Sequence, residues 1–319
     1  MLPKILVTLG VPEEHLAPLA GIAELHILDH GVNAAPRETV LKAIRGCTGV
    51  ISQGELRVDD ELLDAAGHSL KMVANAAMGI DNLDLVALGK RGITASNTPD
   101  AFAESTADHT FGLLLALTRR IAEGDRFVRS GAWAETKMQP LRWEGSLAGG
   151  KTLGIIGYGR IAKLVETRAK AFNLDVIYTR TQPDRSDQYR SLGDLLAQSD
   201  IVLALVPHTP STHHLIDRDA LQQMKPGAIF INVARGKVMD EAAVVDALRS
   251  GHLGGAALDV FEEEPVVNPA FFEMNNVVLT PHTGGATAEE RKRGRMEAAE
   301  NVARFLKGEP LLHPVNLPT

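Results

Sequence analysis

The feature that most constrains the fold is a Gly-x-Gly-x-x-Ala pattern formed by Gly157, Gly159 and Ala162. It stands between a predicted buried strand, Lys151 to Ile156, and a predicted helix, Arg160 to Phe172. In this setting the pattern is typical of the phosphate-binding turn of a dinucleotide fold. The first glycine permits the tight turn, the second lets the backbone approach a pyrophosphate, and the alanine lets helix and strand pack closely. The start of the helix offers N–H groups and partial positive charge to phosphates. A purely structural glycine turn is the alternative.

The position of this turn indicates a two-domain chain. The chain has 319 residues, and nearly half of them precede the glycines. A length of this order is common for two domains, so we expect another domain to come first. We predict one domain from residues 1–98 plus 287–319 and a dinucleotide-binding Rossmann domain from residues 99–286.

Both domains are predicted to be α/β, because apolar strands alternate with helical segments throughout the chain. This rhythm indicates doubly wound parallel sheets with helices on both faces. The strands of the first series are expected at Lys4–Thr8, Glu24–Leu28, Thr48–Ser52, Lys71–Asn75 and Ile93–Ser96. The second series continues after the glycine turn with strands at Asp175–Tyr178, Ile201–Leu205, Ala228–Asn232, Gly255–Leu258 and Val277–Leu279.

Two long helices are predicted from their N-terminal signals. Thr98 and Pro99 suit the cap and the first position of a helix that runs to Arg120. The stretch from Thr287 to Glu290 is a capping box, which predicts a last helix to about Leu306. Because this helix follows the nucleotide domain, we expect it to return to the first domain.

The segment from Glu123 to Gly150 shows no clean periodicity and contains both tryptophans, Trp133 and Trp143. Long irregular segments in compact proteins are usually functional or lie at an interface. Its apolar side chains suit a homodimer contact or the lining of a substrate cleft. Ordinary core packing is the alternative.

Composition excludes several classes of partner. The formal net charge is -7, which argues against nucleic acid or an anionic membrane as the main partner. Cys47 is the only cysteine, so neither an intrachain disulfide nor a thiolate metal cluster is possible, and no metal site is expected. The longest apolar run, Phe111 to Leu117, is too short to span a bilayer. We expect a cytoplasmic enzyme.

Three polar residues follow successive predicted strands of the second series: Arg235, Glu264 and His282. Ligands of open α/β sheets bind at such strand ends, so the three side chains are candidates for one site. Guanidinium binds a carboxylate in bidentate fashion. Imidazole moves a proton near neutral pH, and a carboxylate orients it and favours its protonated form. Taken singly, they can equally be a surface ion pair, a solvated acid and a loop histidine.

Together these motifs resemble those of the D-2-hydroxyacid dehydrogenases, a family that includes glyoxylate/hydroxypyruvate reductases, D-lactate and phosphoglycerate dehydrogenases and formate dehydrogenase. The resemblance runs essentially from end to end. It rests on Asn75 to Asp84, Asn97 to Pro99, Gly154 to Ala162, Pro207 to Pro210 with Thr212, Asn232 to Asp240, Gly255 to Pro265, and Pro281-His282.

The resemblance implies two Rossmann-like domains with a cleft between them, of which the first is a substrate-binding, flavodoxin-like domain. It also implies a role for each matching residue. His282 would be the acid that protonates the ketone oxygen, Glu264 its hydrogen-bond partner, and Arg235 the group that holds the substrate carboxylate and polarises the carbonyl. The N–H groups of Ala77, Met78 and Gly79 would help to bind that carboxylate, and Asp259 would anchor the nicotinamide side of the cofactor. The full set of implied cofactor-binding residues is Thr106, Gly157, Tyr158, Gly159, Arg160, Ile161, Arg180, Thr181, Pro207, Thr212, Val233, Ala234, Asp259, His282 and Gly284.

The cofactor is predicted from the end of the second strand of the nucleotide domain. NAD-selective proteins of this fold carry an acid there that binds the ribose diol. Here Arg180 stands at that place, followed by Thr181, with Arg185 nearby. An arginine and a hydroxyl attract a 2′-phosphate, whereas a carboxylate repels it. The sequence therefore favours NADP, with NADPH preferred over NADH; a surface arginine with relaxed cofactor use is the alternative.

The function expected from the resemblance is reduction of a small 2-ketoacid to the D-2-hydroxyacid, with glyoxylate and hydroxypyruvate as the leading substrates. A 2-ketogluconate or arylpyruvate reductase of the same family is the second candidate. A non-catalytic dinucleotide-sensing scaffold is the candidate from another class. The joint presence of Arg235, Glu264 and His282 favours an enzyme over a scaffold.

Overall fold

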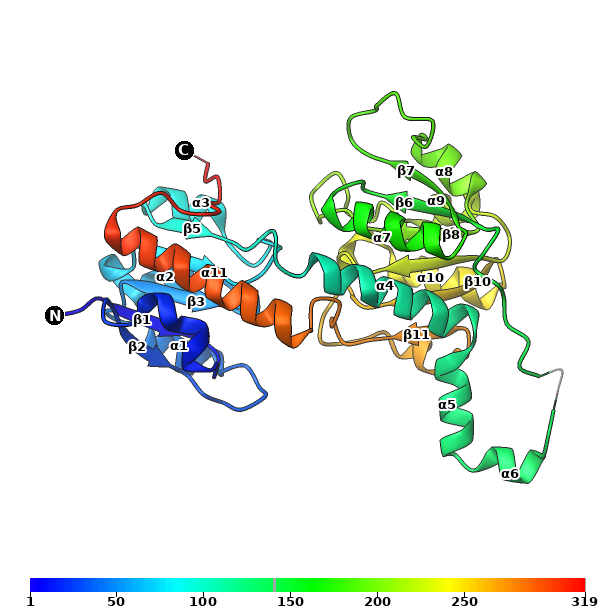
Figure 1. Ribbon diagram of the computed structural model, residues 1–319, viewed down its shortest axis with the longest axis horizontal. Helices are drawn as coiled ribbons and strands as arrows, with labels where there is room; N and C mark the ends of the chain where they lie inside the picture. Colours follow the sequence, from blue (N-terminus) through cyan, green and yellow to red (C-terminus); the bar gives the residue numbers. More distant parts are fainter. Residues whose placement is uncertain (140–141, 319) are drawn as a thin grey trace. The chain divides into compact units, whose positions relative to one another are not determined.

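The computed structural model describes residues 1–139 and 142–318 and divides the chain into two compact units (Figure 1). Unit 1 comprises Met1–Phe102 and Ala286–Thr319, and unit 2 comprises Ala103–Gly285. Each unit has a parallel sheet of its own, as the predicted α/β fold class requires. Among the described residues, no helix combines the length and apolar character needed to cross a membrane.

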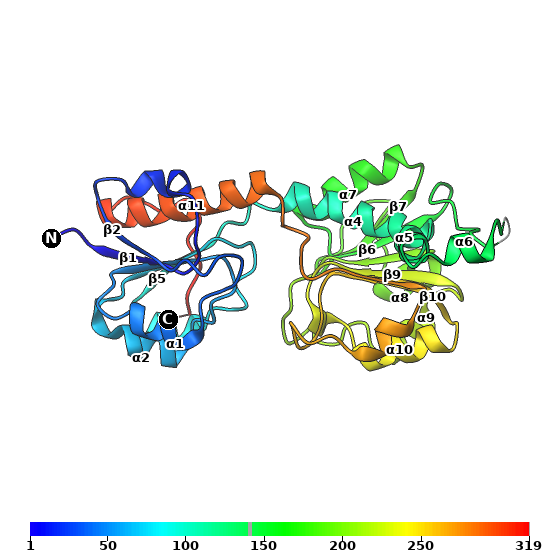
Figure 2. The same ribbon diagram turned by 90° about the horizontal axis from the view of Figure 1, so that it is seen from below.

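Unit 1 is built on a parallel sheet with the strand order β2-β1-β3-β4-β5. Successive residues of each strand point to opposite faces, so the two faces have separate cores. Figure 2 shows α11 on one face and α1 and α2 on the other. The strands are β1 (Lys4–Val7), β2 (Glu24–Ile27), β3 (Gly49–Ser52), β4 (Met72–Asn75) and β5 (Thr94–Ser96). The helices are η1 (Glu13–Leu19), α1 (Arg37–Ala43), α2 (Asp60–Ala66), η2 (Gly67–Ser69), α3 (Leu85–Lys90) and α11 (Ala288–Lys307).

Unit 2 has the strand order β11-β10-β9-β8-β6-β7, again with every pair parallel. In Figure 2, α4 and α7 cover one face and α8, α9 and α10 the other. The strands are β6 (Thr152–Ile156), β7 (Asp175–Thr179), β8 (Ile201–Ala204), β9 (Ala228–Asn232), β10 (Leu253–Leu258) and β11 (Val277–Leu279). The helices are α4 (Ala103–Thr118), α5 (Ile121–Arg129), α6 (Ala132–Thr136), α7 (Arg160–Ala171), α8 (Leu192–Gln198), α9 (Arg218–Gln223), η3 (Gly236–Val238), α10 (Glu241–Arg249) and η4 (Pro269–Glu273).

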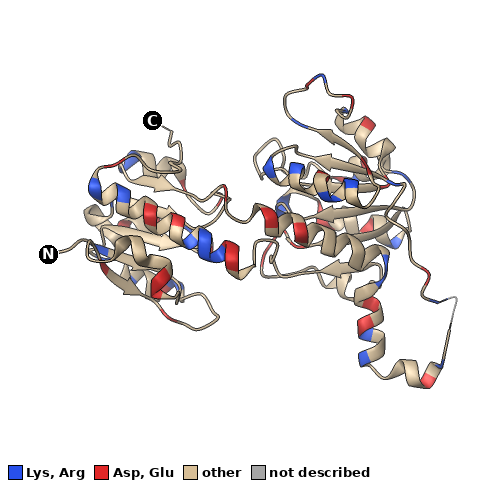
Figure 3. Cartoon of the chain, in the orientation of Figure 1, with Lys and Arg blue, Asp and Glu red and all other residues tan. Residues whose placement is uncertain are grey.

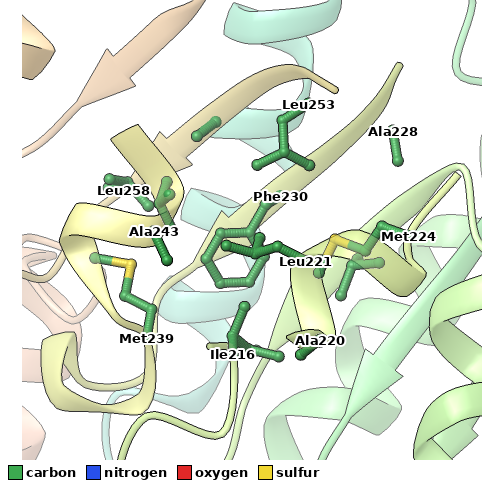
Figure 4. Packing of buried hydrophobic residues seen from close by; sticks show 14 of the residues in the cluster. Ile216, Ala220, Leu221, Met224, Ala228, Phe230, Met239, Ala243, Leu253 and Leu258 are labelled. Carbon is green, nitrogen blue, oxygen red and sulfur yellow. The ribbon is translucent and has the colours of Figure 1, made fainter. Parts of the chain in front are cut away.

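The core under α8, α9 and α10 is centred on Phe230 of β9, which is fully buried. Figure 4 shows its ring surrounded by side chains of the neighbouring helices and strands, among them Leu221, Ile216, Ala243 and Leu253. Burial of an aromatic ring of this size stabilises a fold by about 1.5–3 kcal/mol. Because this packing holds β9 and β10 in place, it also fixes the loops that follow them.

The start of α4 corrects the sequence prediction. The helix begins at Ala103, so Thr98 and Pro99 are not its cap and first position. Thr98 is completely buried, and its backbone N–H donates to Ala77 O at 3.0 Å. Phe102 has a φ of 74°, which no residue of a right-handed helix adopts, so a turn separates Thr98 from the helix.

The segment around residues 121–150 is also more regular than predicted, because it contains α5 and α6. Neither helix buries a side chain, so core packing is the wrong interpretation for them. Figure 1 shows α5 and α6 extending away from the sheet of unit 2. Residues 13–19 form a 3-10 helix that contains Pro18, whose missing N–H disfavours an α-helix there.

Candidate active site

In unit 1 the loop after β4 is held by asparagine side chains. Asn75 is completely buried, and its Nδ2 donates to Gly79 O at 2.8 Å. Asn97 Nδ2 donates to Met78 O at 2.8 Å, and the N–H of Thr98 donates to Ala77 O at 3.0 Å. All three carbonyl groups of Ala77, Met78 and Gly79 are therefore occupied by donors of the protein.

The N–H groups of the same three residues donate no hydrogen bond within the described part of the chain. All three residues are partly exposed. Successive N–H groups that are not used within the protein can bind an anion, and such a set is called a nest where the backbone is concave. The three predicted substrate-binding residues offer unused N–H groups, and binding of a carboxylate by them stays a prediction.

In unit 2 the glycine turn lies between β6 and α7, at the point where the sheet order reverses between β6 and β8. Gly157 has a φ of 95°, and a Cβ there would lie 2.7 Å from Val206 Cγ1. A Cβ at Gly159 would meet nothing within 4 Å, so the space in front of this turn is open. The first turn of α7 carries no acidic side chain. These features fit a pyrophosphate, which needs close backbone approach and a positive helix end.

The loop after β9 places Arg235. Asn232 is completely buried, accepts from Ala234 N at 3.0 Å and donates to Arg235 O at 3.0 Å. A Cβ at Gly236 would lie 1.9 Å from the backbone of Phe261, so only glycine fits there. The loop is therefore pressed against the segment that leads to Glu264.

His282 and Glu264 form a close pair. His282 Nδ1 lies 2.7 Å from Glu264 Oε2, while Glu264 Oε1 accepts from Phe261 N at 3.0 Å. The hydrogen bond and charge of Glu264 raise the pKa of His282 against the opposing effects of burial and of the Arg235 charge. Burial acts to raise the pKa of Glu264, but His282, Phe261 N–H and Arg235 together hold it below its ordinary value.

The positive charge of Arg235 acts to lower the pKa of both members of the pair. The side chain of His282 is 48% exposed, so its ring reaches solvent. With Nδ1 engaged by Glu264, Nε2 has no hydrogen-bond partner among the described residues. Unit 2 thus brings together a cation, an orienting carboxylate and a histidine that favours its protonated form.

Asp259 organises the loop that carries His282. It is 1% exposed and accepts from Thr280 Oγ1 at 2.6 Å, Thr283 N at 2.8 Å and Gly284 N at 2.8 Å. These bonds give Asp259 a positioning role. Its predicted contact with the nicotinamide stays a prediction.

His109 belongs to the same cluster and was missed in the sequence. Its Nε2 lies 3.2 Å from Asp259 Oδ1 and 3.0 Å from Thr280 Oγ1. His109 lies on α4, far from both partners along the chain, and no local motif marks it. Only the packing of α4 on the sheet reveals the contact. Thr106, one turn earlier on α4, would lie 3.6 Å from a Cβ at Gly284.

The other predicted cofactor residues follow different strands of the sheet in unit 2. Arg180 and Thr181 follow β7 at one edge, and His282 and Gly284 follow β11 at the other. Tyr158, Arg160 and Ile161 lie in or just after the glycine turn. After β8, Thr212 Oγ1 donates to Pro207 O at 2.6 Å and closes a turn. Val233 and Ala234, after β9, are buried.

Within the described residues, no group of three or more histidine, cysteine, aspartate or glutamate side chains is arranged to hold a metal ion.

Comparison with known proteins adds independent information. Residues 111–284 match the family model for the NAD-binding domain of D-isomer specific 2-hydroxyacid dehydrogenases. The chain is 40% identical to a glyoxylate reductase of Pyrococcus furiosus over 97% of this chain and 94% of that protein.

Two solved structures are similar to this chain along nearly its whole length. The TT0316 protein from Thermus thermophilus superposes with a TM-score of 0.91 at 39% identity, covering 98% of this chain and all of that one (100%). An NADPH-dependent glyoxylate/hydroxypyruvate reductase from Sinorhizobium meliloti, solved in complex with NADP and malonate, has a TM-score of 0.85 at 31% identity, covering 99% of this chain and 97% of that one. The chain belongs to the D-isomer specific 2-hydroxyacid dehydrogenase family and is an oxidoreductase acting on CH–OH groups.

Proposed function

We propose that the chain reduces glyoxylate and hydroxypyruvate to the corresponding 2-hydroxyacids, of D configuration where the product is chiral, with NADPH as the preferred hydride donor. The observation that carries this proposal is the His282–Glu264 pair beside Arg235, because it offers a proton donor and a carboxylate-binding cation together. The relatives named glyoxylate reductase and glyoxylate/hydroxypyruvate reductase support this choice of substrate.

The nucleotide would be held along the carboxyl ends of the strands of unit 2. Gly157, Gly159 and the first turn of α7 suit its pyrophosphate, as the open space at Gly159 indicates. When bound, NADPH supplies the hydride that reduces the keto carbon. Val233, Ala234 and the loop carrying Gly284 are proposed to line the nicotinamide half of the site.

The chain's own residues would bind and protonate the ketoacid. Arg235 holds the substrate carboxylate in a bidentate pair and polarises the carbonyl. The N–H groups of Ala77, Met78 and Gly79 in unit 1 are also proposed to bind a carboxylate, without contributing a titratable group. The protonated His282 gives the proton on Nε2 to the ketone oxygen, and Glu264 stabilises the imidazolium beforehand.

The preference for NADPH rests on Arg180, which follows β7 and has a side chain that is 44% exposed. A guanidinium at this place can bind a 2′-phosphate, with Thr181 as a further donor.

The test is a panel of ketoacids assayed with NADPH and with NADH. We expect the highest kcat/KM for glyoxylate or hydroxypyruvate with NADPH, and a product of D configuration from hydroxypyruvate. Faster turnover of 2-ketogluconate or an arylpyruvate would replace the proposed substrates by the second candidates. Cofactor binding without turnover of any ketoacid would favour the sensing scaffold.

We also propose a homodimer formed through α5 and α6. Large apolar side chains there are exposed, including Ile121, Val128, Trp133 and Met138. With Phe127 and Trp143, three of these residues line a hollow of about 420 Å³. Exposed apolar patches of this kind often mark protein–protein interfaces. Light scattering, which measures the mass of the protein in solution, tests the proposed dimer.

A further inference from the structure

The loop after β7 carries an acid as well as the arginine proposed to bind the 2′-phosphate. Figure 3 shows both basic and acidic residues in the loop that joins β7 and α8. Arg180 Nη1 lies 3.5 Å from Asp184 Oδ2. The cation predicted to select NADPH is therefore already paired with a carboxylate of the chain.

Asp184 is held in place independently of Arg180. Tyr178 Oη donates to Asp184 Oδ2 at 2.8 Å, and Ser186 N donates to Asp184 Oδ1 at 2.9 Å. The hydrogen bond from the Ser186 N–H, and to a smaller extent the one from Tyr178, lowers the pKa of Asp184 below its ordinary value. The carboxylate therefore stays charged near neutral pH. The acid is thus a fixed charge rather than a mobile surface group.

The tyrosine that holds Asp184 is itself anchored beside the glycine turn. Tyr178 is 3% exposed, and its ring stacks on Tyr158 with centroids 3.7 Å apart and planes 8° from parallel. The hydroxyl of Tyr158 donates to Glu166, a buried residue of α7 that Lys170 also contacts at 2.8 Å. The position of Asp184 is therefore tied to the turn proposed to bind the pyrophosphate.

We propose that Asp184 is a specificity-determining residue that limits the preference for NADPH and permits use of NADH. The inference rests on the proposed role of Arg180. A 2′-phosphate that binds Arg180 must break the Arg180–Asp184 ion pair. It then lies beside a fixed negative charge, which opposes its binding. An unphosphorylated ribose instead offers a hydroxyl donor to the carboxylate, the interaction that an acid makes in NAD-selective proteins.

The experiment compares Asp184→Asn with the wild type, using kcat/KM for NADPH and for NADH at one saturating ketoacid concentration. We expect kcat/KM to rise for NADPH and to fall for NADH. The ratio of the two should then move by about tenfold toward NADPH, a change equivalent to about 1.4 kcal/mol. Dissociation constants from nucleotide fluorescence should fall for NADPH and rise for NADH. High salt should reduce the gain for NADPH, because screening weakens the repulsion that the variant removes.

Asp187→Asn is the matched control, since Asp187 is an exposed acid of the same loop and its carboxylate makes no contact with Arg180. It should leave the ratio unchanged. Tyr178→Phe should move the ratio in the same direction as Asp184→Asn but less, because the carboxylate loses one of its anchors. If Asp184 only shapes the loop, Asp184→Asn will weaken both cofactors in parallel, and that result overturns the inference.

Arg180→Ala separates this inference from the function it rests on. An NADPH kcat/KM unchanged by Arg180→Ala overturns the proposed 2′-phosphate site itself. If Arg180→Ala lowers kcat/KM for NADPH but Asp184→Asn leaves the NADPH-to-NADH ratio of kcat/KM unchanged, only the role of Asp184 is overturned.

Discussion

The two candidate substrate-binding regions use different chemistry to bind an anion. The loop after β4 in unit 1 offers main-chain N–H groups, and its carbonyls are held by uncharged donors such as Asn75 and Asn97. The loops after β9, β10 and β11 in unit 2 offer charged side chains, Arg235, Glu264 and His282. The first region offers no titratable group, whereas the charges of the second shift the pKa values of Glu264 and His282.

Proton transfer is thereby confined to unit 2, whereas carboxylate binding is proposed for both units. Main-chain N–H groups do not titrate near neutral pH, so the loop of unit 1 can hold a carboxylate equally well over a wide pH range. The protonation of His282 depends on Glu264 and Arg235, so the pH dependence of reduction should arise in unit 2. Variants in the two regions should therefore change different kinetic parameters.

The largest expected effect comes from His282→Ala. Removing the proton donor should lower kcat by about 10²–10⁴-fold, the usual contribution of general acid–base catalysis. Steady-state kinetics at saturating NADPH measures this loss. His252→Ala is the control, because His252 contacts Leu221 O and lies outside the candidate site. A loss of less than tenfold in His282→Ala would assign proton donation to another group.

A smaller effect is expected from Asn97→Ala in unit 1. Met78 O would lose its side-chain donor, and the loop after β4 that offers the three N–H groups would become less well fixed. A hydrogen bond of this kind contributes about 0.5–1.5 kcal/mol, so KM for the ketoacid should rise by roughly two- to tenfold. The pH profile should keep its position. Asn33→Ala, at an exposed site of the same unit, should change neither. A shifted pH profile in Asn97→Ala would contradict the division of roles between the two regions.

The smallest change in maximal rate, but a distinct change in pH profile, is expected from Glu264→Gln. Glu264 raises the pKa of His282, so removing its charge should lower that pKa. The acid form would then be lost earlier as pH rises, and the alkaline limb of kcat/KM for reduction should move to lower pH. Glu263→Gln removes an exposed charge one residue away and should leave the limb in place. A limb that stays in place or moves upward in Glu264→Gln would show that it reports another group.

Most strands were predictable because their signals are local. The predicted cap at the start of α11 is another example, because Thr287 Oγ1 accepts from Glu290 N at 3.4 Å. The start of α4 was not predictable in this way. Thr98 and Pro99 carry a helix-start signal, but Phe102 has a φ of 74°, and the helix begins only after it. A local signal of this kind does not fix the residue at which the helix begins.

The sequence by itself determined the parallel α/β class, the dinucleotide turn and the identity of Arg235, Glu264 and His282 as candidates. These follow from hydrophobic period, glycine stereochemistry and side-chain chemistry, all of which act within a few residues. Only the tertiary structure decided which donors occupy the carbonyls of the loop after β4, that His109 contacts Asp259, and that Asp184 pairs with Arg180. Such contacts depend on where separate segments are packed, and that position is set by the burial of whole faces of the sheets rather than by any local pattern.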